Sequence, residues 1–217
     1  MNVLHVIANP RPIEESVSKQ LAAAFFGKLL EKNPDVTVNN VDLYQDPPPF
    51  LDYDAYRRFY LPLTDAAYKP SKAEDAAIRY AQQQAEVLRQ ADVLVLTMPM
   101  WAGGPPAIMK AWLDQVVQPE LMYTMGDEGI KPLHQLRKVV MLVSSGDVYK
   151  ENDPRDGLVP CIRATFGFVG VTEFEIAWAD GQDASIWPDA TERKQAALDM
   201  TEELAGETTE LPRFRNQ

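Results

Sequence analysis

Residues 92–108 of the chain read DVLVLTMPMWAGGPPAI, and this stretch indicates the class of fold. Its first half is almost wholly apolar, which is typical of a strand buried on both faces of a parallel sheet. Its second half holds two glycines and two prolines, and a segment with the character of a helix follows. A buried strand that passes through a turn into a helix is the repeating unit of an α/β domain.

The same alternation of strand and helix runs along the rest of the chain. Short apolar or alternating runs predict five strands, at residues 3–8, 36–43, 92–98, 138–145 and 172–179. Amphipathic segments and capping residues predict helices at residues 14–31, 71–88, 105–118, 155–169 and 189–204. This order favours a flavodoxin-like three-layer α/β sandwich, with a five-stranded parallel sheet of order 2-1-3-4-5 and right-handed crossovers.

No break in composition divides the chain, so we expect one domain over residues 1–205. Within it, residues 44–70 are expected to form an irregular, aromatic-rich insertion, and residues 123–133 a loop rich in glycine and charge. Residues 206–217 are expected to be a loosely held C-terminal tail.

Composition and charge narrow the class of protein. With 217 residues, 46% of them hydrophobic and 24% charged, the chain can bury the core of one globular domain. Its net charge of -11 lacks the basic surface that binds nucleic acid, and an anionic membrane would repel it. No run approaches the roughly 20 apolar residues that span a bilayer, and the first residues lack the basic start of a signal peptide. The single cysteine, Cys161, excludes an internal disulfide and a multi-cysteine metal site, which fits the reducing cytoplasm.

The predicted topology indicates where a ligand binds. In open parallel sheets, ligands lie outside the carboxyl ends of the strands, at the point where the strand order reverses. The loops at residues 8–18, 99–106 and 144–149 are therefore expected to meet there. In the first loop, Ser16 and Ser18 either bind a phosphate at the start of a helix or simply cap that helix. No glycine-rich dinucleotide motif and no P-loop is present.

The second loop holds Trp101, Gly103 and Gly104. One interpretation is that a flat ring lies against the bare glycine backbone, with Trp101 beside it. The alternative is a tight turn from strand to helix, with Trp101 packed on the core. Pro105 or Pro106 then occupies the first helical turn.

No catalytic acid-base pair is evident. His5 lies within a predicted strand and is expected to be a core residue, whereas His134 is expected to be solvated in a loop. Cys161 is expected to be buried rather than nucleophilic. A cofactor that carries its own chemistry is the simplest way for such a site to catalyse a reaction.

Several short motifs, spread over nearly the whole length of the chain, resemble in their order and spacing those of one protein family. They are Ser16-Val17-Ser18 at the first helix, Pro99 to Gly103 after the third strand, and Lys110, Trp112, Leu113 and Asp114 in the next helix. Tyr123-Thr124, Ser144 to Asp147 and Gly167 to Gly170 follow. The chain resembles the flavodoxin-like NAD(P)H:quinone oxidoreductases of the FMN-dependent NADH-azoreductase type.

The resemblance implies a cofactor, FMN, and a set of residues that hold it. It places the phosphate on Ser16, Val17 and Ser18, and the edge of the ring along Pro99, Met100, Trp101, Ala102 and Gly103. Ser144, Ser145, Gly146 and Asp147 would bound the other side of the ring. It further implies a homodimer in which NADH or NADPH reduces the flavin and a quinone or azo compound then takes two electrons. The FMN carries the chemistry, so no catalytic side chain and no metal are expected.

This chain departs from the family pattern in two loops. The family usually has P-M-Y-N-F after the third strand, where this chain has Trp101, Ala102 and Gly103. It often has S-R-G-G after the fourth, where this chain has Ser145 and Asp147. Recognition of the ring would then rely on the backbone, and a carboxylate near the flavin would disfavour an anionic reduced ring.

The aromatic insertion has two interpretations. Phe50, Tyr53, Tyr56, Phe59 and Tyr60 either form a lid over the flavin or pack locally or in a dimer interface. As a lid, Phe50, Tyr56, Phe59 and Tyr60 would line the substrate pocket together with Tyr123. Arg57 and Arg58 are either surface cations or contacts for the phosphates of the nicotinamide donor.

Two other functions fit the same fold. An acidic flavodoxin-like carrier would shuttle electrons without turnover of its own. A regulatory module would keep the fold and a flavin site without catalysis. Oxidation of NADH in the presence of a quinone, by the purified protein alone, separates the enzyme from both.

Overall fold

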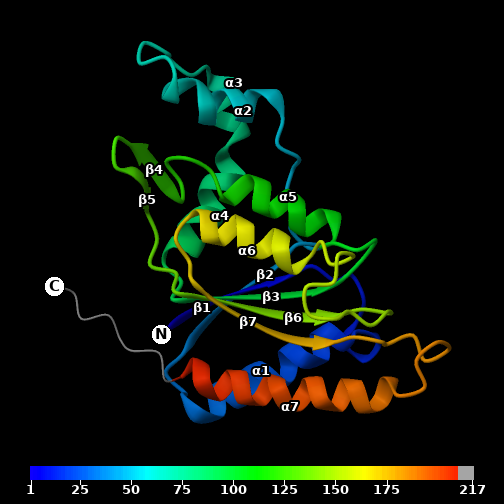
Figure 1. Cartoon of the computed structure of the whole chain (residues 1–217). Coiled ribbons are helices and arrows are strands. Elements are labelled where there is room, and N and C mark those ends of the chain that lie inside the picture. The colour runs from blue at the N-terminus through cyan, green and yellow to red at the C-terminus, as the bar shows by residue number, and fades with distance from the viewer. Residues whose placement is uncertain (210–217) are drawn as a thin grey trace.

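The computed structural model describes residues 1–209 of the chain, and its centre is a five-stranded parallel sheet (Figure 1). The strands lie in the order β2-β1-β3-β6-β7, and every neighbouring pair is parallel. Their bounds are Asn2–Ile7 for β1, Thr37–Asp42 for β2, Val93–Pro99 for β3, Lys138–Ser144 for β6 and Glu173–Ala179 for β7. The predicted parallel α/β sandwich is thereby confirmed.

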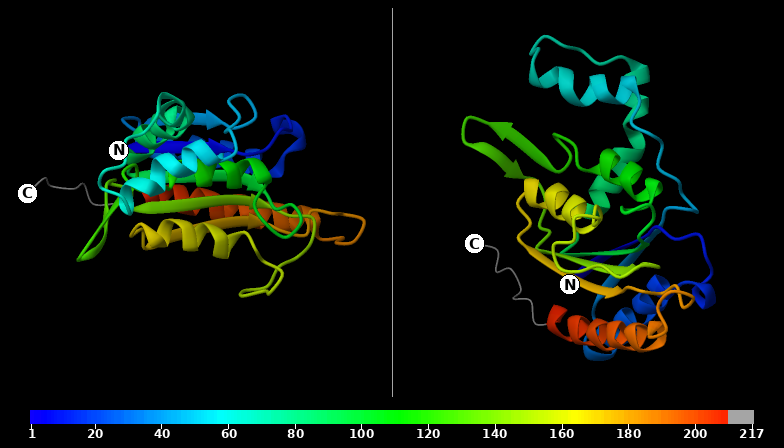
Figure 2. Two further views of the ribbon diagram at one scale, coloured as in Figure 1. Left: turned by 90° about the horizontal axis from the view of Figure 1, so that it is seen from above. Right: turned by 45° about the vertical axis from the view of Figure 1, so that its right-hand side comes forward.

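Helices cover both faces of the sheet (Figures 1 and 2). One face carries α1 (Val17–Lys32) and α7 (Ala190–Thr208), and the other carries α4 (Arg79–Arg89), α5 (Ala107–Val116) and α6 (Val159–Phe168). Two separate hydrophobic clusters fill these layers. Every residue of β3 is buried, as expected for a central strand covered on both sides.

Two short strands were not predicted. β4 (Tyr123–Gly126) and β5 (Gly129–Pro132) form an antiparallel hairpin outside the main sheet, in the stretch expected to be a loop. Most of their residues are exposed, so no apolar alternation marks them in the sequence. Because the hairpin comes before β6, the order along the sheet departs in its numbering from the predicted 2-1-3-4-5.

The insertion at residues 44–70 is more regular than predicted. It contains α2 (Tyr53–Tyr60), which Asp52 caps by accepting a hydrogen bond from the Ala55 N–H at 2.8 Å, and a 3-10 turn at Leu61–Leu63. α2 packs against α3 (Lys72–Ala77), and the two helices stand away from the sheet (Figures 1 and 2). The helix predicted over residues 71–88 is therefore two helices, which meet at Ile78.

The start of α3 confirms one local prediction. Ser71 and Glu74 form a full capping box, in which each side chain bonds the backbone of the other. Arg57 and Arg58 are surface cations tied to this helix, through ion pairs with Glu74 and Asp75. Both arginines thus hold α2 to α3.

The bounds of the first and last helices differ from the prediction. A short 3-10 helix at Ile13–Glu15 precedes α1, so the first α-helix begins later than predicted. α7 continues to Thr208, beyond the predicted limit, and Gly206 in its last turn lies next to the Lys32 side chain of α1. Residues 206–208 are thus the last helical turn, and the rest of the expected tail, from residue 210, lies outside the described residues.

His5 is the core residue that its place in a strand predicts. It is 5% exposed, and its two ring nitrogens bond the side chains of Asn40 and Thr97 at 2.9 and 2.8 Å. Burial lowers its pKa from 6.5 to about 4, although Asn40 and Asp42 act in the opposite direction. The protein therefore holds His5 neutral at pH 7.

This burial predicts a pH-dependent loss of stability. Above pH 6.5, His5 is neutral in both the folded and the unfolded chain, so its contribution to stability is complete. Between pH 6.5 and about 4 only the unfolded chain takes up the proton, and about 3 kcal/mol of stability is lost. Urea unfolding across this range should show the loss in the natural protein and a shallower slope in His5→Gln. Equal slopes would contradict the burial of a neutral imidazole.

Candidate functional site

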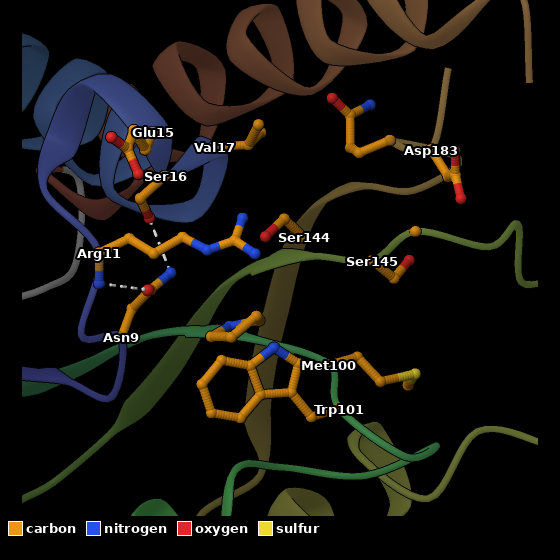
Figure 3. Close-up of a pocket in the computed structure, with 13 residues that line it drawn as sticks. Asn9, Arg11, Glu15, Ser16, Val17, Met100, Trp101, Ser144, Ser145 and Asp183 are labelled. Atoms are coloured by element: carbon orange, nitrogen blue, oxygen red, sulfur yellow. Dashed lines mark hydrogen bonds between the residues drawn. The ribbon is translucent and has the colours of Figure 1, made fainter. Parts of the chain in front are cut away.

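A pocket of about 380 Å³ opens at the carboxyl ends of β1, β3 and β6 (Figure 3). This volume lies within the range of small-molecule sites. The loops expected to meet there do meet, and a fourth loop, after β7, joins them. The pocket is lined by Asn9, Arg11, Glu15, Ser16, Val17, Pro99, Met100, Trp101, Ser144, Ser145, Gly146, Gln182 and Asp183.

Most of the residues predicted to bind a cofactor reach this pocket. Those that line it are Ser16, Val17, Pro99, Met100, Trp101, Ser144, Ser145 and Gly146. Those that do not are Ser18, Ala102, Gly103 and Asp147. The lining residues that the sequence analysis missed are Asn9, Arg11, Glu15, Gln182 and Asp183.

Ser16 caps the first α-helix and also lines the pocket. Its hydroxyl caps α1 by accepting the Lys19 N–H at 3.2 Å, and it also faces the pocket. Ser18 lies behind it with no exposed surface. The Asn9 amide donates to both hydroxyls, at 2.7 Å to Ser16 and 3.1 Å to Ser18. Asn9 thereby fixes the start of α1 at the edge of the pocket.

Arg11 is the cation of this pocket. Figure 3 shows its side chain reaching from the β1 loop toward Ser144, across the space beneath Ser16. Its backbone is fixed, since its N–H donates to Asn9 and its carbonyl accepts from Lys19. Within residues 1–209, no carboxylate pairs with its guanidinium. A free guanidinium beside the N-terminus of a helix forms a site for an anion such as phosphate.

The glycines after β3 belong to a tight turn. Trp101 and Gly104 exchange two backbone hydrogen bonds of 3.0 Å, and the residues between them, Ala102 and Gly103, have φ angles of 48° and 76°. These are features of a type I′ turn. The Gly103 carbonyl then accepts the Gly157 N–H at 2.7 Å. Neither Gly103 nor Gly104 lines the pocket, and the Gly103 carbonyl faces this neighbouring loop, so the expectation that a flat ring lies against the two glycines stays a prediction without support here.

Trp101 itself stands at the edge of the pocket (Figure 3). It is 42% exposed, so the alternative of a tryptophan packed on the core is wrong. Pro106 lies just before α5, as its N-cap. The turn thus presents an indole face to any aromatic ligand in the pocket.

A fourth loop reaches the pocket by pairing with the loop after β6. The Gln182 N–H donates to the Ser145 carbonyl at 2.9 Å, and the Asp183 N–H donates to the Gly146 carbonyl at 3.1 Å. The Ser145 hydroxyl is engaged as well, with the Asp147 carbonyl and the Trp178 indole N–H. The small polar residues at 181–185 were the only sequence signal for this loop, and it lies beside the predicted loops only because β7 pairs with β6.

Asp147 does not present a carboxylate to the pocket. It pairs with Arg155, and its pKa is low because it accepts the Val148 N–H and the Arg155 guanidinium. The negative charge in the pocket lining, expected from Asp147, instead comes from Asp183 and Glu15.

The aromatic insertion does not reach this pocket within one chain. Phe50 is 80% exposed, whereas Phe59 packs in a small cluster with Ala55 and Ile78. Tyr60 is half-buried beside this cluster, and Tyr56 is exposed. Phe59 therefore packs locally, as one of the two interpretations predicts. None of these aromatic side chains lines the pocket of its own chain.

Three further predictions concern side chains outside the pocket. Tyr123 is buried in the core, edge-on to Phe168, so it does not line the pocket either. His134 is half-buried, and its two ring nitrogens bond the Val169 carbonyl and the Leu136 N–H, so the expectation of a solvated histidine is wrong. Cys161 is partly exposed on α6. Residues 1–209 contain no cluster of three side chains able to hold a metal ion, and no described helix is long and apolar enough to cross a membrane.

The parallel sheet, its strand order and a ligand-sized pocket at the reversal point together define the flavodoxin-like class of α/β proteins. Comparison with known families agrees, since the model of a flavodoxin-like fold family matches residues 1–204. The chain belongs to this family.

Individual proteins of known name are similar to this chain in sequence or in structure. An FMN-dependent NADH:quinone oxidoreductase of Azotobacter vinelandii is 31% identical over 181 residues, which cover 83% of this chain and 88% of that protein. One of Alcanivorax borkumensis is 28% identical over 205 residues, covering 94% and 99%. The solved structure of an azoreductase from Bacillus anthracis superposes with a TM-score of 0.84 at 26% identity, covering 95% and 99%.

Proposed function

We propose that this chain is an FMN-dependent oxidoreductase that transfers two electrons from NADH or NADPH to quinones, and also to azo compounds. The observation that carries the proposal is the pocket itself, with an unpaired guanidinium at one end and an exposed indole beside it. The likeness to named NADH:quinone oxidoreductases and to an azoreductase structure supports the same reaction class.

The residues of the pocket fit FMN. The dianionic phosphate matches Arg11, the Ser16 hydroxyl and the free N–H groups at the start of α1. A planar ring matches the space between the Met100-Trp101 segment and the Ser144 to Gly146 segment. Pro99 and Val17 supply apolar surface at the two sides. Ser18 supports this site from behind through Asn9.

The protein's part in the reaction is to bind, to orient and to leave one face of the ring open. FMN, when bound, would supply the redox chemistry, that is, acceptance of a hydride from the nicotinamide donor and transfer of two electrons to the acceptor. Backbone pairing of Gln182 with Ser145 and of Asp183 with Gly146 holds that side of the pocket rigid. Trp101 offers its ring to the aromatic donor and acceptor.

A second copy of the chain completes the site in this proposal. Among residues 1–209 of one chain, no aromatic side chain besides Trp101 lines the pocket, while Phe50 and Tyr56 are exposed on or next to α2. We propose a homodimer in which these side chains help to cover the partner's acceptor site. We also propose that residues 1–205 act as one FMN-binding domain in the cytoplasm, which fits a chain with one cysteine.

Two measurements test this function. Titration with FMN should give a yellow complex, with one FMN per chain. The purified complex should then oxidise NADH steadily when menadione is supplied, with no second protein. A chain that leaves FMN unbound contradicts the whole proposal. A chain that binds FMN but needs a separate reductase is an electron carrier.

A further inference from the structure

The charged groups of the pocket are unevenly placed. Its lining holds one cation, Arg11, and two carboxylates, Glu15 and Asp183. Figure 3 shows Glu15 next to Ser16, near Arg11, whereas Asp183 lies on the far side of the pocket. The anion-binding end and the Asp183 end are therefore opposite each other.

Bound FMN would pair with Arg11, the one cationic side chain among the described residues that line the pocket. In the proposed function, on which this inference rests, the phosphate pairs with Arg11 at the start of α1. The flavin ring and its acceptor then lie toward Trp101 and Asp183. No cationic side chain of the lining remains there to receive a negatively charged acceptor.

Two nearby arginines, one in the loop before α6 and one on α7, are already engaged in ion pairs. Arg155 pairs with Asp147 and Asp153, and Arg193 pairs with Asp180 and Asp189. Neither arginine lines the pocket. Among the residues that line the pocket, Asp183 is therefore the charged side chain at the acceptor end.

The Asp183 carboxylate is fixed and ionised. It accepts hydrogen bonds from the N–H and the hydroxyl of Ser185, and its own N–H is held by the Gly146 carbonyl. The carbonyl of Asp183 accepts two further N–H groups, from Ile186 and Trp187. Both Ser185 bonds lower the pKa of Asp183, so it stays charged at neutral pH. It cannot swing away from an incoming anion without breaking them.

We propose that Asp183 selects the electron acceptor by charge, favouring neutral quinones and disfavouring aromatic acceptors that carry a carboxylate or sulfonate. A like charge several ångströms away in a partly solvated pocket lowers affinity by roughly five- to twentyfold. A neutral acceptor does not meet this repulsion. Asp183 therefore acts as a specificity-determining residue for the second half-reaction.

The first test measures turnover with two acceptors of different charge. The FMN-loaded natural protein, Asp183→Asn and Asp35→Asn are compared with menadione and with 1,2-naphthoquinone-4-sulfonate at low salt. Asp35 is exposed beyond the opposite end of the sheet. Its replacement by asparagine therefore removes the same negative charge at a place outside the pocket. We expect Asp183→Asn to raise kcat/KM for the sulfonate about five- to twentyfold, with menadione unchanged within twofold. Asp35→Asn should leave both values unchanged, and added salt should shrink the difference.

The second test measures binding without turnover. The oxidised, FMN-loaded proteins are titrated with naphthalene-2-sulfonate and naphthalene-2-carboxamide, and the flavin absorbance reports binding. Only the sulfonate should bind more tightly to Asp183→Asn. Asp183→Ser, which is smaller and also uncharged, should behave like Asp183→Asn if the charge is the cause.

The outcomes separate this inference from the proposed function. If the natural protein reduces menadione with NADH but Asp183→Asn leaves the ratio of the two acceptors unchanged, selection by Asp183 is wrong. The same conclusion follows if both naphthalene ligands gain affinity equally. If the natural protein oxidises no NADH with menadione, the proposed function itself fails.

Discussion

Replacing Arg11 by methionine is expected to weaken FMN binding by about 10- to 150-fold while leaving riboflavin affinity within twofold. Methionine keeps an unbranched stem and removes only the guanidinium. That group is the unpaired cation of the pocket, and hydrogen bonds to a charged partner contribute roughly 1.5–3 kcal/mol each. Riboflavin lacks the phosphate, so its affinity does not depend on this contact. Fluorescence titration of both flavins measures the difference.

Arg163→Met provides the matched control. Arg163 lies on α6 over the ring of Phe174 and does not line the pocket, so the substitution removes the same charge elsewhere. FMN affinity should remain unchanged in this variant. If FMN and riboflavin lose affinity equally in Arg11→Met, the guanidinium does not contact the phosphate.

Replacing Gly157 by alanine is expected to destabilise the protein by about 2–4 kcal/mol. A Cβ at this position would lie 2.7 Å from the Gly103 carbonyl oxygen, which is backbone and cannot move aside alone. The same carbonyl accepts the Gly157 N–H, so relief of the clash also weakens that bond. Overpacking costs roughly 1–3 kcal/mol and a lost hydrogen bond roughly 0.5–1.5 kcal/mol. Urea unfolding measures the change.

The same substitution should also weaken FMN binding. The Gly103 carbonyl belongs to the turn that positions Trp101 at the pocket, so a shift of this turn moves the indole. Gly27→Ala is the control, because a Cβ there meets nothing within 4 Å and alanine favours the helix by up to about 1 kcal/mol. Unchanged stability in Gly157→Ala would show that the contact between the two loops does not hold the turn.

Local patterns predicted most of the sheet. The strand expected at residues 92–98 is observed at Val93–Pro99, and the one expected at 138–145 is observed at Lys138–Ser144. These strands are buried on both faces, so each leaves a continuous apolar run. The β4-β5 hairpin and α2 were missed because they lie outside the main core and leave no such run.

The sequence predicted the location of the pocket more accurately than it predicted the residues that line it. Topology brought three loops to one edge, and the structure confirms that meeting. It does not confirm Gly103 and Asp147 as lining residues. Gly103 turns its carbonyl to Gly157, and Asp147 pairs with Arg155. Both partners lie in the loop before α6, at positions that the sequence analysis assigned to the start of a helix over residues 155–169.

The sequence alone determined the α/β class, the alternation of strands and helices and the edge at which a ligand binds. These depend on the spacing of apolar residues along a strand or a helix, and that spacing is local. Only the tertiary structure decided that Arg11 and Asp183 face the pocket from opposite ends. Which way a loop side chain faces depends on backbone bonds between distant segments, such as that of Asp183 with Gly146, and no local pattern records such bonds.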